Sequence, residues 1–125
     1  MRSAVAIAVL ACAFALAPGS AGIAQEACVE PAVPAPVDGA QVSEEQMRAA
    51  AAAARNFIAQ SDVYQLCLAN VLDAAKTQAA ADGKPLDIAL ESTLRTKAEA
   101  NQKVKERVGL EINTAIGVYK QTHLK

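Results

Sequence analysis

Apolar and small residues recur every three or four positions over two long stretches of the chain, residues 44–81 and 86–122. This spacing is typical of amphipathic α-helices that bury one face. The first stripe contains Ala50, Ala54, Phe57, Ser61, Tyr64, Leu68, Val71 or Leu72, Ala75 and Ala79, and the second contains Leu90, Leu94, Asn101, Val104, Val108, Ile112, Ala115 and Tyr119. Two helices of similar length with a short connection predict an all-α fold, an antiparallel two-helix hairpin of the coiled-coil kind over residues 43–125.

Local signals place the ends of these helices. Ser43 followed three residues later by Gln46 is a capping box, which begins the first helix at residue 44. Gly83 fits the left-handed position after a helix end, and Pro85 fits the first turn of the next helix. The helices are therefore predicted to meet at a tight turn over residues 82–85.

Residues 1–24 read as a secretory signal peptide. A positive start at Arg2 precedes an apolar run over 4–17, which is too short for a membrane span of about 20 residues. Small residues favour cleavage after Ala24, with Ala21 as the alternative, and a lipoprotein-type cleavage before Cys12 would leave a very short apolar core. We expect a periplasmic or secreted protein that is not inserted in the membrane after cleavage, with a formal net charge of −2 once Arg2 is removed.

Export leaves two cysteines, Cys28 and Cys67, because Cys12 leaves with the signal peptide. A pair of cysteines in an oxidising compartment predicts a disulfide, the alternative being two unrelated thiols. Cys28 lies in residues 25–42, a proline-bearing segment that we call the strap and that favours an extended path with a turn at Asp38-Gly39.

The strap is long enough to reach Cys67. Fifteen extended steps from Cys28 to Ser43 span about 46 Å, and the 24 helical steps from Ser43 to Cys67 span about 36 Å. The sequence predicts that the strap runs back along the rear of the first helix, where small residues surround Cys67. That rear face contains Ala49, Ala52, Asn56, Ala59, Val63, Cys67, Asn70 and Ala74. The alternative is a disordered tail whose cysteine pairs between chains.

Two features of the second helix stand out. Asn101 lies on the apolar stripe, where it either fixes helix register as a buried amide or sits at an edge in solvent. Gly109, Asn113 and Gly117 form a four-spaced row beside the stripe, with Leu110 opposite it, and glycine inside a helix costs about 1 kcal/mol. The row is a candidate interaction face for a homodimer, or it allows close packing on the alanines of the first helix, which is the slightly favoured explanation.

The sequence predicts no enzyme, metal site or cofactor. His123 is the single histidine, and metal ions need converging ligands. Cys-x-x-Cys-His, phosphate-loop and Gly-x-Ser-x-Gly motifs are missing from the sequence, and the near-neutral charge argues against nucleic acid.

A resemblance to other proteins implies a cellular location for this chain but no activity. The cysteine and prolines of the strap, Tyr64-Gln65-Leu66-Cys67-Leu68, and the segments 101–109 and 112–116 together resemble small exported helical proteins of alphaproteobacteria with no known activity. The resemblance implies a periplasmic setting. We expect a non-enzymatic structural or interaction protein that binds an envelope protein or a second copy of itself, the alternatives being a holdase-like chaperone and, less favoured, a small-ligand binder or enzyme.

Overall fold

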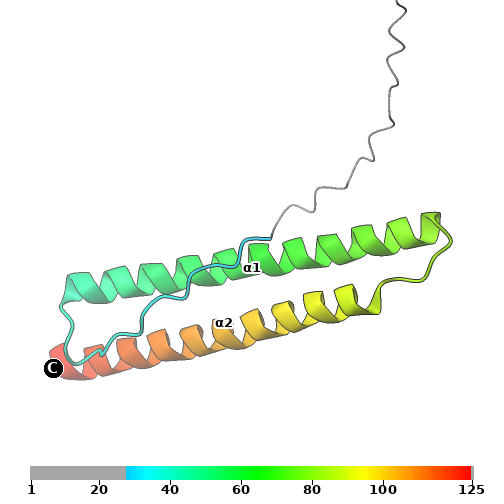
Figure 1. The fold of residues 1–125 in the computed structure, drawn as a ribbon. Helices are drawn as coiled ribbons and strands as arrows, with labels where there is room; N and C mark the ends of the chain where they lie inside the picture. Colours follow the sequence, from blue (N-terminus) through cyan, green and yellow to red (C-terminus); the bar gives the residue numbers. More distant parts are fainter. Residues whose placement is uncertain (1–27, 125) are drawn as a thin grey trace, which may run out of the picture.

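The computed structural model describes residues 28–124, which form two α-helices packed against each other (Figure 1). Helix α1 spans Glu44–Ala81 and helix α2 spans Ile88–His123, and the two run antiparallel. The described residues contain no β-strand, so the predicted all-α hairpin is confirmed. The signal peptide predicted over 1–24 lies outside the described residues.

The predicted bounds of α1 are confirmed at both ends. The Ser43 hydroxyl accepts a hydrogen bond from the Gln46 backbone N–H at 3.2 Å, and the Ser43 N–H donates to Gln46 Oε1 at 2.8 Å. These bonds satisfy two groups that a helix start leaves without intrahelical partners. At the other end Gly83 has a φ of 62°, the left-handed conformation that glycine adopts without steric cost.

The start of α2 differs from the prediction. Pro85 lies in the connection and not in the first helical turn, and α2 begins at Ile88 instead of residue 86. Asp87 is the N-cap, because its Oδ1 accepts from the N–H groups of Ala89 at 2.9 Å and Leu90 at 3.3 Å. The Asp87 side chain caps the backbone N–H groups at the helix start, whereas a proline side chain has no group that can accept these bonds. The helix therefore begins after Asp87, and the connection is longer than the predicted turn.

Two apolar clusters hold the helices together, with a polar layer between them. One cluster is built from Ala54, Phe57 and Val108, and the other from Tyr64, Leu68 and Leu94. Between them Asn101 is 2% exposed and Ser61 is fully buried. The predicted stripes are therefore the faces that the two helices bury against each other from Ala54 to Leu68 and from Leu94 to Ala115.

The strap crosses the groove between the two helices (Figure 1). Near its turn, Gly39 is buried so closely on α2 that an added Cβ would overlap the Ala115 carbonyl oxygen. Pro34–Val37 then lie over residues of both helices, among them Ala54 and Val108. The strap thus covers the junction of the helices along the half of the hairpin that contains the start of α1.

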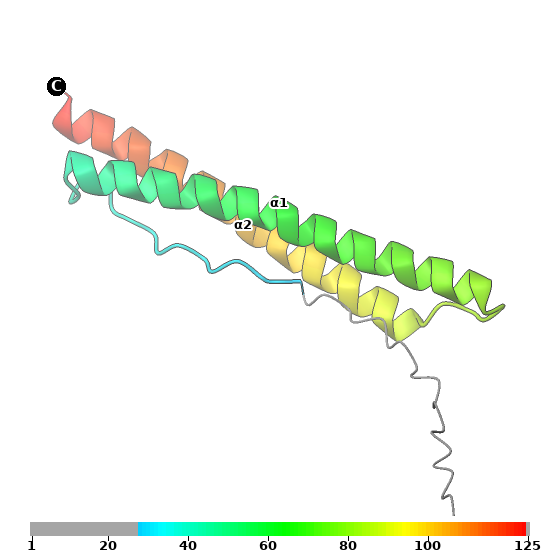
Figure 2. The same cartoon turned by 90° about the horizontal axis from the view of Figure 1, so that it is seen from above.

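The prediction that the strap lies against the rear of α1 is wrong. Viewed from above, the strap lies beside the helix pair and not over the outer surface of α1 (Figure 2). Of the predicted rear face, Cys67 is half-buried, whereas Ala49, Ala52, Asn56, Ala59, Val63, Asn70 and Ala74 are exposed. A groove provides apolar contacts from two helices at once, whereas the rear of one helix offers a single convex surface, so the groove buries more of the strap.

Candidate functional site

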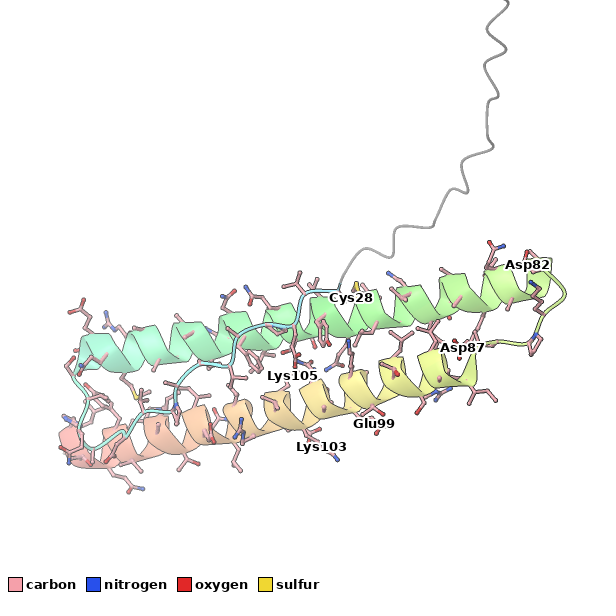
Figure 3. The ribbon with its side chains drawn as sticks, in the orientation of Figure 1. Cys28, Asp82, Asp87, Glu99, Lys103 and Lys105 are labelled. Atoms are coloured by element: carbon pink, nitrogen blue, oxygen red, sulfur yellow. A yellow bond between two sulfur atoms is a disulfide. The ribbon has the colours of Figure 1, made fainter. Side chains whose placement is uncertain are left out.

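The disulfide predicted between Cys28 and Cys67 is present. The S–S distance is 2.02 Å and the two Cα atoms are 5.7 Å apart. Cys28 packs against the cluster of Tyr64, Leu68 and Leu94, so the bond fixes the strap to α1 where the strap also touches the core. Figure 3 shows Cys28 against α1 about midway along the helix.

The strap fits its half of the groove closely. Beneath Pro34–Val37 the remaining cavity between strap and helices is about 20 Å³, room for about one water molecule. Pro31 is buried. Among residues 28–124, no backbone hydrogen bond joins residues 29–37 to either helix. The contact is therefore made by apolar packing of an extended chain on two helices.

The same groove stays open beyond the disulfide. A cavity of about 730 Å³ lies between the second half of α1, the connection and the start of α2. Its α1 wall runs from Val63 to Asp82, and Lys84–Asp87 and Leu90 form the rest. We call this cavity the open groove. Figure 3 shows Asp82 and Asp87 at the two ends of the connection that closes it.

The open groove is a cavity because the α1 side chains along much of its wall are too small to fill the space between the helices. Ala74, Ala75 and Ala79 line it on α1 and leave room opposite Leu86 and Leu90. In the other half of the hairpin, Ala50 and Ala54 leave the same kind of room, and the strap fills it. The described part of the strap ends at Cys28, so nothing in residues 28–124 fills the second half.

Aliphatic side chains are exposed beside the disulfide and at the edge of the open groove. Val63 is 68% exposed and Leu66 is 62% exposed, and both line the groove with Cys67. Val29, next to Cys28 in the chain, is also exposed. Exposed aliphatic residues that gather at the rim of an apolar cavity are typical of an interaction surface.

The buried amide of Asn101 belongs to a hydrogen-bonded layer across the helix pair. Its Nδ2 donates to the Ser61 hydroxyl at 3.2 Å, and its Oδ1 accepts from Gln65 Nε2 at 2.8 Å. Gln65 Nε2 also donates to Gln102 Oε1 at 3.1 Å. The buried alternative for Asn101 is confirmed, and because the bonds join both helices, they favour one register of α1 against α2.

The candidate interaction face on α2 lies on the surface. No heavy atom within residues 28–124 lies within 4 Å of where a Cβ would stand on Gly109 or Gly117, apart from the nearby backbone of α2 itself. Leu110 and Asn113 are exposed. Close packing of this row on the alanines of α1 was therefore the wrong explanation, and the homodimer face stays a prediction.

The titratable groups of the described chain gather in no reactive cluster. No group of three His, Cys, Asp or Glu residues within 28–124 could hold a metal ion. His123 stacks on the Tyr119 ring with centroids 4.4 Å apart, and its Nδ1 lies 3.2 Å from the Tyr119 carbonyl oxygen. Burial, with a smaller effect from the Glu30 carboxylate, raises the pKa of Tyr64. Lys105 Nζ lies 2.6 Å from Asp62 Oδ1, which links the two helices at the surface.

Comparisons of the chain with protein-family models, curated proteins and solved structures found no match. Neither described helix has an apolar stretch long enough to cross a membrane.

Sequence reasoning found the disulfide but missed the open groove. The alanines at 74, 75 and 79 were assigned to a rear face or a helix stripe, not to the wall of a cavity. Asp87 was a usable signal for the longer connection that borders the groove. Aspartate is a strong N-cap residue, so it predicts that the second helix begins after residue 87 and that the connection is longer than a tight turn.

Proposed function

We propose that this chain is a non-enzymatic interaction protein of the periplasm and that it binds an envelope partner through the open groove. One observation carries the proposal: the groove is an apolar cavity of about 730 Å³ rimmed by exposed Val63 and Leu66. Binding cavities in proteins are commonly of this size and mostly apolar. The disulfide stabilises the strap at the border of the groove, which keeps this surface pre-formed.

Crosslinking in living cells tests the proposal. A photoreactive amino acid replaces Leu66 at the rim in one variant and Ala52, an exposed residue of α1 outside the groove, in the control. We expect a crosslinked envelope protein from position 66 and not from position 52. Identical products from both positions would refute the proposal, and so would no product together with a monomeric protein at high concentration.

A holdase-like chaperone is the second candidate. It is favoured by the way the groove already packs an extended, proline-bearing segment of this chain against both helices. Suppression of the aggregation of a model unfolded substrate is the direct assay. No suppression at an excess of the protein would exclude this candidate while leaving a specific partner open.

A further inference from the structure

We infer that the open groove binds an extended, proline-bearing aliphatic peptide of a partner chain, in the same manner as the strap occupies the other half. This inference depends on the proposed function and names the class of ligand. The groove is continuous with an interface that is already formed, because Cys67 borders the open groove and its disulfide partner Cys28 ends the described strap. The two halves also share a feature, since alanines of α1 line each of them together with aliphatic residues from across the groove, Val108 and Ile112 under the strap and Leu86 and Leu90 in the open groove.

Backbone chemistry favours proline in such a ligand. Helical N–H and C=O groups bond within their own helix, so the walls offer an extended peptide few backbone partners. A buried N–H without a partner costs free energy, and proline has none. The strap shows this in part: Pro31 is buried and Pro34 is half-buried, while Pro36 is exposed, and residues 29–37 make no backbone hydrogen bond to the helices within residues 28–124.

Length argues for a partner and against the chain's own N-terminus. The α1 wall of the groove, from Val63 to Asp82, is about 28 Å long at the helical rise, which is the length of about nine extended residues. The predicted cleavage after Ala24 would leave three residues before Cys28, and three extended residues span about 9 Å. More than half of the groove therefore stays free for a peptide from another molecule.

A titration with a defined peptide tests the inference. The probe is a synthetic nonapeptide with the sequence of residues 29–37, added to the disulfide-bonded protein and followed by amide chemical shifts. We expect saturable shifts at groove residues such as Val71, Ala75 and Leu90. A control peptide with alanine in place of the prolines should bind more weakly. No shift at millimolar peptide would overturn the inference, and so would shifts confined to Ala54 and Val108, because the peptide would then be replacing the strap.

Matched charge variants locate the site. Ala74→Glu places a carboxylate in the groove wall, and Ala59→Glu places one on the same helix outside the groove; both alanines are exposed, so both variants should fold. Ala74→Glu should weaken peptide binding about tenfold or more, as expected for a charge that loses water without gaining a partner. Equal affinities of the two variants would refute the assignment.

Two further outcomes separate this inference from its rivals. Sedimentation measures whether the protein dimerises, and dilution without peptide shows which amide shifts depend on protein concentration. If the protein dimerises and the groove amides shift on dilution, a second copy occupies the groove and the inference is wrong. If position 66 crosslinks an envelope protein but the peptide does not bind, the interaction function stands and the ligand class is wrong. Peptide binding by a protein that stays monomeric at high concentration, with no crosslinked protein from position 66, would refute the proposed function instead.

Discussion

Removal of the disulfide should cost this protein a large part of its stability. The variant is Cys28→Ser/Cys67→Ser, which leaves no lone thiol among the described residues. The bond joins residues 39 positions apart, and closing a loop of that length lowers the entropy of the unfolded chain by an amount worth about 4 kcal/mol. Domains of this size are stable by about 5–15 kcal/mol. The alanine-rich helix faces bury little area per residue, so we expect the variant to be marginally folded.

Urea unfolding followed by helical circular dichroism measures this loss. The double variant and the reduced wild-type protein should both lose about 4 kcal/mol, with a larger m-value because the unfolded chain becomes less compact. The helical signal in the absence of urea should persist, since Cys28 is the one strap residue in the two apolar clusters that join the helices among residues 28–124. A loss of stability below about 1 kcal/mol would refute the reasoning. A covalent dimer of the oxidised wild-type protein on a non-reducing gel would contradict the intrachain bond.

Three other predictions follow from the packing. Gly39→Ala should cost about 1–3 kcal/mol because its methyl overlaps an α2 carbonyl, whereas Gly117→Ala, which meets open space, should stabilise α2 by up to about 1 kcal/mol; equal effects in urea unfolding would contradict the strap's position. Asn101→Leu should cost about 1–3 kcal/mol by leaving the buried Ser61 hydroxyl without its partner, and adding Ser61→Ala should recover part of that loss. A double variant no more stable than the single one would count against the hydrogen-bonded layer. Burial and the Glu30 carboxylate of the strap raise the pKa of Tyr64 from its ordinary value of 10.0. The contribution of Tyr64 to stability is therefore present below pH 10 and is lost as the pH rises through the folded pKa. Subtracting the absorbance titration of Tyr64→Phe from that of the wild type isolates Tyr64, whose tyrosinate should form at higher pH in the folded protein than in the unfolded chain.

Short stretches of sequence determined the two helices, their ends and the cysteine pair. The three-and-four spacing determined two helices and their buried faces, since a helix repeats every 3.6 residues whatever packs against it. Ser43, Gln46 and Gly83 determined helix ends through bonds and dihedral angles within a few residues. The cysteine pair followed from counting the cysteines outside the predicted signal peptide, and the chain length between them allowed the bond.

The path of the strap and the open groove were decided by the tertiary structure. A helical projection of α1 shows two surfaces near Cys67, the rear face and the edge of the groove, and the sequence of α1 alone does not rank them. The ranking depends on α2, whose Val108 and Ala115 form the second wall under the strap. Likewise, the alanines at 75 and 79 become the wall of a cavity because the connection and Leu90 stand opposite them. Spacing along the chain determines which residues share a face, whereas the space between faces depends on the side chains that the neighbouring element supplies.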